Sequence, residues 1–177
     1  MKDNDGDTPD PEVPPREPMQ APPLIDEIEH GSAEYTDDEL FEQAAFNAQA
    51  LVLGTVQTLS SVEGGLDRWR VGIADVFARG WDLTRPWRAA EILDALLTNY
   101  RAFGADIIEV DLSTQLPTAL ISGLPDLELA ETLKLDPGHI GELFAVGGLI
   151  VQRLGGTLAW EIDEETGDVR LSVTTVS

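Results

Sequence analysis

The chain contains no cysteine and only two histidines, His30 and His139. Without cysteine it can form neither a disulfide nor a thiolate nucleophile, and a zinc site of the usual Cys and His ligands has no support. A Ser-His-Asp triad is equally unsupported, because no serine stands at a diagnostic spacing from a histidine and an aspartate. We therefore assign no catalytic residue from the sequence.

Basic residues are scarce as well. The 177 residues include 33 acidic and 11 basic side chains, which gives a formal net charge of −22, and only Lys2 and Lys134 are lysines. Such a surface repels phosphate backbones and anionic lipid headgroups. The composition therefore predicts that the chain binds neither nucleic acid nor membranes.

Long apolar runs are also missing. The longest, residues 143–151, is about half of the ~20 residues that a transmembrane helix needs. The first residues, MKDNDGDTPD, are neither apolar nor basic, unlike a secretory signal. We expect a soluble cytoplasmic protein.

An acidic, lysine-poor composition is typical of proteins from a high-salt cytoplasm, where dense charge maintains solubility. We interpret the chain as halophilic; the alternative is an acidic protein that mimics nucleic acid. Carboxylates repel one another over a Debye length of ~30 Å at 0.01 M salt but only ~3 Å at 1 M. The melting temperature should therefore rise steeply with potassium chloride concentration, and a flat dependence would contradict the halophilic interpretation.

Residues 1–35 differ from the rest of the chain and are predicted to be a disordered acidic tail. Seven of the 11 prolines lie there, among many acidic residues, and such a segment buries too little apolar surface to offset its ordering entropy. Leu24, Ile25 and Ile28 form the one apolar group within it. They are either a short docking motif or part of the solvated tail.

Residues 36–80 are predicted to form a helical hairpin that dimerises. Thr36 and Glu39 have the spacing of a capping box, and a second helix is expected over about residues 66–78. Apolar residues recur at helical spacing on one face of each segment. For the first helix these are Phe41, Ala45, Ala48, Val52, Val56 and Leu59, and for the second Trp69, Ile73, Val76 and Phe77.

Residues 81–177 predict a mixed α/β arrangement. A helix is expected from a cap at Thr84, with Pro86 in its first turn and a buried stripe at Leu93, Leu96, Leu97 and Tyr100. Strands are expected at 106–113 and 117–124, weak helix at 126–135 and an apolar helix at 141–154. Two alternating runs around Glu-Glu-Thr-Gly at 164–167 predict a C-terminal β-hairpin. The fold class is α+β: N-terminal helices followed by a two-layer sandwich.

Two segments within residues 37–177 resemble the histidine-kinase-type ATPase superfamily. The first is EILDALLTNYRAFGADIIEVDLS (91–113), in which Glu91, Leu93, Leu96, Leu97 and Asn99 fall on the spacing of that family's N-box helix. The second is ELFAVGGLIVQRLGGTLAWEIDEETGDVRLSVTTV (142–176), which is similar to the family's glycine-led helix, Gly-Gly turn and terminal hairpin.

The resemblance implies a nucleotide site. Asn99 would coordinate magnesium on the nucleotide phosphates, Asp136 and Gly138 of DPGHIG would bind adenine, and the backbone N–H groups at Gly147 and Gly148 would cradle phosphate. On this hypothesis the chain is a signalling protein that binds ATP and magnesium.

The chain also departs from the family pattern. Ala95 replaces a second asparagine, the second glycine of DPGHIG is one residue too far, and no histidine nucleophile stands on the first helix, so autokinase chemistry is not expected. Asn99 is then a helix-flank residue, and Gly147 and Gly148 allow close helix–sheet packing.

We therefore interpret the chain as a degenerate member of this superfamily: a non-catalytic regulatory or adaptor protein, without a cofactor, that acts through an unidentified protein partner and as a homodimer. ATP and magnesium binding is the alternative, and a halophile-specific interaction protein is a further one. One basic group is either a partner patch or a set of residues that balance nearby acids: Arg68, Arg70, Arg79, Arg85, Arg88 and Arg101.

Overall fold

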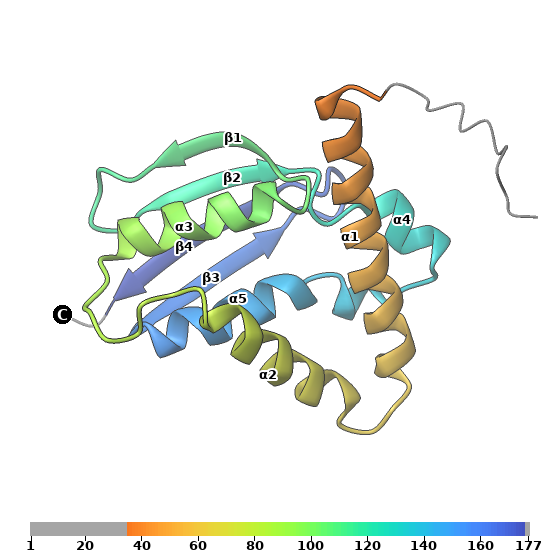
Figure 1. The fold of residues 1–177 in the computed structure, drawn as a ribbon, viewed down its shortest axis with the longest axis horizontal. Helices are drawn as coiled ribbons and strands as arrows, with labels where there is room; N and C mark the ends of the chain where they lie inside the picture. The colour runs from red at the N-terminus through yellow and green to blue at the C-terminus, as the bar shows by residue number, and fades with distance from the viewer. Residues whose placement is uncertain (1–34, 176–177) are drawn as a thin grey trace, which may run out of the picture. The chain divides into compact units, whose positions relative to one another are not determined.

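A computed structural model describes residues 35–175 (Figure 1). The predicted tail, with Leu24, Ile25 and Ile28, lies outside the described residues. The elements, in chain order, are α1 (Asp37–Ser60), α2 (Gly65–Ala78), α3 (Ala89–Arg101), β1 (Asp106–Asp111), β2 (Thr118–Ser122), α4 (Leu127–Thr132), a 3₁₀ turn (Pro137–His139), α5 (Glu142–Arg153), β3 (Gly156–Ile162) and β4 (Val169–Thr175). This order confirms the predicted α+β class.

The four strands form one antiparallel sheet in the order β1-β2-β4-β3. The predicted C-terminal hairpin is confirmed, and its register runs from Gly156 opposite Thr175 to Ile162 opposite Val169. The Asp163 side chain accepts hydrogen bonds from the N–H groups of Glu165 and Thr166, which closes the turn. Period-two alternation places Leu158, Val169, Leu171 and Val173 on the buried face of the hairpin.

Helices α3 and α5 cover this face, so the sheet and the two helices form two layers (Figure 1). The predicted stripe of α3 is confirmed: Leu93, Leu96, Leu97 and Tyr100 are all buried in the main core, together with Ile92. The rings of Tyr100 and Phe144 meet edge to face, with 5.2 Å between centroids, and so join α3 directly to α5.

The predicted start of α3 is wrong by about one turn. The helix begins at Ala89, because the Thr84 N–H and hydroxyl both bind the Asp82 carboxylate and hold Thr84 in a turn. Glu91 accepts a hydrogen bond from the Arg88 N–H at the true start. That bond, followed by the bond from the Arg88 side chain, lowers the pKa of Glu91 to about 2.

The buried face of α1 differs from the predicted one. Ala45 and Val56 are buried as expected, but Phe41 is exposed and the centre of the face is occupied by Gln49 and Leu53. The Gln49 amide donates to the Gly123 carbonyl and accepts from the Asp126 N–H, both at 2.9 Å. A polar residue that satisfies two backbone groups can be buried, and hydrophobic periodicity does not detect it.

The predicted face of α2 is also wrong in its second half. Val76 and Phe77 are exposed, whereas Ala74 and Ala78 are buried. Ala74 packs with Val146 and Ile150 of α5. Small side chains on α2 allow the close approach of the two helices, and the larger residues turn outward. None of the described helices combines the length and hydropathy needed to cross a membrane.

The predicted capping box of α1 is confirmed and can be tested. The Thr36 hydroxyl accepts from the Glu39 N–H at 3.2 Å, and the Glu39 carboxylate accepts from the Thr36 N–H at 2.8 Å. Thr36→Ala should lower the free energy of unfolding by about 1 kcal/mol in urea titrations. Thr58→Ala is the control, because Thr58 only bonds back to Gly54 within the helix; equal effects of the two substitutions would contradict the role of the cap.

Candidate functional site

Asn99 lies in the last turn of α3, and its side chain is exposed. Its amide donates to the Ala95 carbonyl at 2.8 Å, one turn earlier in the same helix. The amide nitrogen is thus occupied locally, and the amide oxygen is the atom that remains to accept or coordinate. This geometry is that of a helix-flank residue beside an opening.

Gly147 and Gly148 lie on different faces of α5. A Cβ atom on Gly147 would come closer than 3.0 Å to the Tyr100 hydroxyl oxygen, whereas one on Gly148 would lie 3.5 Å from the Trp160 ring, an ordinary contact. Gly147 is therefore required by the close approach of α3 to α5. Gly148 is not required by packing in the same way.

Asp136 and Gly138 lie in the segment before α5. The Asp136 carboxylate accepts from the Gly138 N–H at 2.8 Å and caps the 3₁₀ turn, and both residues are exposed. Of the predicted site residues, the structure brings Asn99 and Gly147 together at one cavity. Asp136, Gly138 and Gly148 do not line that cavity.

The cavity has a volume of about 250 Å³ and lies between α2, α3 and α5. Among the described residues its lining contains no charged side chain, and its polar side-chain groups are the Asn99 amide, the Tyr100 phenol and the Trp81 indole N–H. The lining residues are Phe77, Trp81, Leu96, Asn99, Tyr100, Ala102, Phe103, Leu143, Val146, Gly147 and Ile150. A neutral apolar molecule suits such walls, whereas a phosphate would find no cationic side chain there.

Tyr100 is the unusual group of this cavity. Its side chain is 4% exposed, and its hydroxyl is buried without a hydrogen-bond partner among the described residues. Burial raises the pKa of Tyr100, so the phenol is neutral at physiological pH. The sequence placed Tyr100 on a core stripe, but no local signal predicted the cavity, because its walls come from three separate helices.

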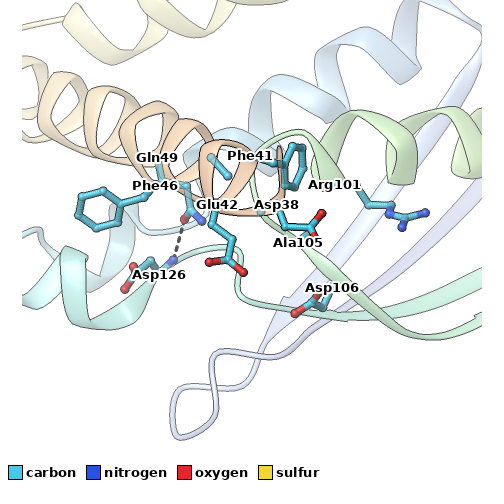
Figure 2. Close-up of a pocket in the computed structure, with 11 residues that line it drawn as sticks. Asp38, Phe41, Glu42, Phe46, Gln49, Arg101, Ala105, Asp106 and Asp126 are labelled. Atoms are coloured by element: carbon cyan, nitrogen blue, oxygen red, sulfur yellow. Dashed lines mark hydrogen bonds between the residues drawn. The ribbon is translucent and has the colours of Figure 1, made fainter. Parts of the chain in front are cut away.

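A second hollow, a groove of about 460 Å³, lies along the first half of α1 (Figure 2). Figure 2 shows Asp38, Glu42 and Asp106 between α1 and the start of β1, with Arg101 extending away from them. Asp126 adds a fourth carboxylate, and Phe41 and Phe46 are exposed beside it. Carboxylates and aromatic faces together suit a cationic side chain.

The arginines named above do not form one free patch. Arg70 binds Glu142 and Asp67, while Arg85 and Arg88 both contact Glu91. Half of the group therefore balances neighbouring acids. Within residues 35–175, no three His, Asp or Glu side chains are close enough together to hold a metal ion.

The outer surface of α1 is distinguished by what it lacks. Residues 43–62 contain no charged side chain, in a chain of which 25% is charged. Leu51, which is 72% exposed, and Phe46 and Asn47 project from this stretch to solvent. The uncharged run is visible in the sequence, but its exposure became apparent only from the fold.

Comparisons of the chain with protein-family models, curated proteins and solved structures found no match.

Proposed function

We propose that the protein is a non-catalytic regulatory or adaptor protein that resembles a degenerate histidine-kinase-type domain and acts as a homodimer through the outer face of α1. The observation that carries this proposal is the uncharged, partly apolar outer surface of α1 over residues 43–60, where Phe46, Asn47 and Leu51 are exposed. Interface centres are depleted of charged residues relative to the remaining surface, and exposed apolar patches mark interaction sites.

The occupant that best fits this face is a second copy of the chain. Two molecules that each carry −22 repel one another over most of their surfaces, and an uncharged face is where contact costs least. Around Gly54, a Cβ atom would meet no other atom within 4 Å, so the helix is open to close approach at that point. Ala44 is exposed on the same helix, and Ala50 is half-buried.

The experiment is sedimentation equilibrium of the full chain in molar potassium chloride, which screens the net charge. We expect a monomer–dimer equilibrium in the micromolar range that is abolished by Asn47→Glu/Leu51→Glu without a large change in melting temperature. The matched control is Ile108→Glu/Val110→Glu, which charges two exposed apolar residues of the edge strand β1. A monomer at all concentrations, or a dimer sensitive only to the β1 variant, would contradict the proposal.

Nucleotide binding is the alternative function, and an Asn99→Ala variant tests it. Because Asn99 is exposed and bonded within its own helix, Asn99→Ala should change the free energy of unfolding by less than about 0.5 kcal/mol. We also expect no ATP or ADP binding at millimolar ligand, measured by calorimetric titration with and without magnesium. Magnesium-dependent binding that disappears in Asn99→Ala would instead support the nucleotide hypothesis.

A further inference from the structure

The two edge strands of the sheet, β1 and β3, differ in how they are protected against pairing with another chain. We propose that β3 accepts an extended segment of a partner protein as an additional strand, in which apolar side chains that face α5 alternate with basic side chains on the opposite face. This inference rests on the proposed adaptor role, for which it names the class of partner, and it does not depend on a dimer at α1.

The β1 edge is protected against strand addition. The strand order places β1 and β3 at opposite edges of the sheet (Figure 1). A bulge interrupts the pairing of β1 with β2 between Ile107 and Glu109. Carboxylates also lie along this strand, at Asp106, Glu109 and Asp111. Bulges and charged side chains are the usual devices that prevent an exposed edge from pairing with another chain.

The β3 edge has neither device. Its pairing with β4 runs without a register shift from Gly156 to Ile162, and Glu161 is the one charged residue of the strand. Within residues 35–175, no strand pairs with β3 on its other side. A regular edge strand without a bulge, a proline or several charges is open to pairing with an added strand.

The hairpin register identifies the main-chain groups that an added strand would meet. The Asp163 N–H donates to the Asp168 carbonyl across the hairpin, and main-chain groups point alternately to the two sides of an antiparallel strand. Every second residue back from Asp163 therefore bonds to β4, whereas the N–H and C=O groups of Leu158 and Trp160 point to the free edge. An added strand would supply their hydrogen-bond partners, which is how extended peptides bind to sheet edges.

A groove of about 430 Å³ lies beside these residues, where an added strand would be placed. Its walls come from α2 and β3, and its floor comes from α5, which packs against both. The charged members of the lining, Asp67 and Arg70, lie 2.8 Å apart and pair with each other. The groove therefore offers no free charge, and the side chains that enter it should be apolar.

The groove surface provides contacts for those apolar side chains. Ala145 and Gly148 of α5 are small, and a Cβ atom on Gly148 would lie 3.5 Å from the Trp160 ring. Trp160 is 38% exposed, Val71 of α2 is 49% exposed, and Leu149 is half-buried. Aliphatic side chains of an added strand would cover this apolar surface, which solvent otherwise contacts.

Glu161 determines the chemistry of the opposite face of the added strand. Because the Trp160 ring lies against α5, the next side chain, that of Glu161, projects from the other face of the sheet. Glu161 is exposed and forms no ion pair within residues 35–175. Opposite charges on neighbouring strands are stabilising, and the net charge of −22 attracts a basic segment.

The probe is the acetylated and amidated peptide Lys-Val-Lys-Val-Lys-Val-Lys, titrated into the ¹⁵N-labelled full chain and followed by ¹H–¹⁵N correlation spectra. Molar potassium chloride screens non-specific attraction to the acidic surface. We expect the largest shifts at the amides of Ala145, Gly148, Leu158 and Trp160. The control peptide Lys-Lys-Val-Val-Val-Lys-Lys has the same composition but cannot direct all its valines toward α5, so it should bind about tenfold more weakly.

Main-chain methylation distinguishes strand addition from other modes of binding. In an added strand, the central valine and the lysine beside it direct their N–H groups to opposite sides, so one N–H faces β3 and the other faces away. N-methylation of the residue that faces β3 should abolish binding at millimolar peptide, whereas N-methylation of the other should change the affinity by no more than about twofold. Two methylated peptides that bind equally would overturn the proposal.

Charging the groove tests the location of the site. Val71→Lys/Leu149→Lys should abolish peptide binding, with folding checked by the melting temperature. Ile108→Lys/Val110→Lys is the matched control, because it adds the same charge to exposed apolar residues of the β1 edge, and it should bind the peptide as the parent does. The reverse pattern, or shifts centred on β1, would overturn the proposal.

The α1 dimer and the β3 site are tested separately. The variant Asn47→Glu/Leu51→Glu, which should abolish the dimer, should still bind the alternating peptide with the affinity of the parent. If the chain is a monomer but binds the peptide, the dimer is wrong and strand addition stands. If the chain dimerises but the alternating peptide does not bind at millimolar concentration, or binds no better than the control peptide, strand addition is wrong.

Discussion

Replacing Arg70 with methionine is expected to lower the free energy of unfolding by about 3–5 kcal/mol, because the buried Glu142 carboxylate loses the guanidinium that binds both of its oxygens and keeps only the contact with His139 Nδ1 at 3.3 Å. Glu142 is 3% exposed. It lies in the first turn of α5, where the helix dipole favours a negative charge. The Nε and one Nη of Arg70 donate to the two carboxylate oxygens of Glu142. Two parallel hydrogen bonds therefore connect the Arg70 guanidinium on α2 to α5.

Arg70 also forms an ion pair at the surface. The contribution of this exposed pair to stability can be measured separately from that of the buried pair with Glu142. The other Nη of Arg70 lies 2.8 Å from Asp67, whose side chain is largely exposed. Such surface pairs contribute at most about 1 kcal/mol, so Asp67→Asn should have a small effect. Arg79→Met is the control for loss of an arginine, since Arg79, the C-cap residue of α2, has no ion pair within residues 35–175.

A double variant distinguishes two effects of removing Arg70: the loss of its attraction to Glu142, and the cost of leaving the Glu142 charge buried without it. In Arg70→Met/Glu142→Leu no charge remains to be desolvated, and replacing a buried ion pair by packed apolar residues is often neutral. We expect the double variant to recover most of the stability in urea unfolding. If Arg70→Met costs no more than Arg79→Met, the buried pair does not hold α2 on α5.

The pH dependence of this interaction follows from the guanidinium. Hydrogen bonding to Glu142, the largest cause, raises the pKa of Arg70 above its ordinary value. A group whose pKa is raised on folding contributes its stability fully below the unfolded pKa and loses it only as the pH rises through the folded value. The guanidinium therefore stays charged across neutral pH, where its contribution to stability is fully present.

The parts of the fold that the sequence predicted are those determined by residues close together in the chain. The box of Thr36 and Glu39 spans three residues, and the alternation before and after residues 164–167 determines the hairpin locally. The pair of Arg70 and Glu142 spans 72 positions, and Gln49 meets Asp126 across 77. Only the packed structure brings such groups together.

The candidate site likewise combines residues that local sequence patterns single out with contacts that only the folded structure reveals. Asn99 and Gly147, which two separate sequence patterns singled out as nucleotide ligands, both line one cavity. The pattern at Asp136 and Gly138 is satisfied by a local cap instead. Tyr100 was recognised as a core residue, yet its unpartnered hydroxyl depends on the position of Gly147, 47 positions later along the chain. Periodicity shows that a side chain points inward but not what it meets there.

Gly147 provides the second large effect. Gly147→Ala should destabilise the protein by about 1–3 kcal/mol, as overpacking of a core usually does, although alanine is the better helix former by about 1 kcal/mol. The reason is the Tyr100 hydroxyl, which a Cβ would approach closer than 3.0 Å. The next contact, Leu158 Cδ2 at 3.3 Å, requires a shift of a few tenths of an ångström at the end of a leucine side chain, and Tyr100 Cζ at 3.5 Å is an ordinary contact.

Tyr100→Phe removes the obstructing oxygen and should rescue the defect. Alone, it should be neutral or slightly stabilising, because the lost hydroxyl is buried without a partner among residues 35–175. In Gly147→Ala/Tyr100→Phe the methyl group fits, and the helix propensity of alanine is gained. Gly148→Ala is the control in the same helix: its Cβ would lie 3.5 Å from the Trp160 ring, so this variant should be neutral or up to about 1 kcal/mol more stable.

Chemical unfolding of the four variants measures this cycle directly. A Gly147→Ala protein as stable as the parent, or a double variant no better than Gly147→Ala alone, would show that the hydroxyl does not restrict position 147. The predicted pattern, with a defect at Gly147 but none at Gly148, ties the first glycine to helix packing. A phosphate cradle predicts no such rescue, because removing the Tyr100 oxygen leaves the backbone N–H groups of α5 unchanged.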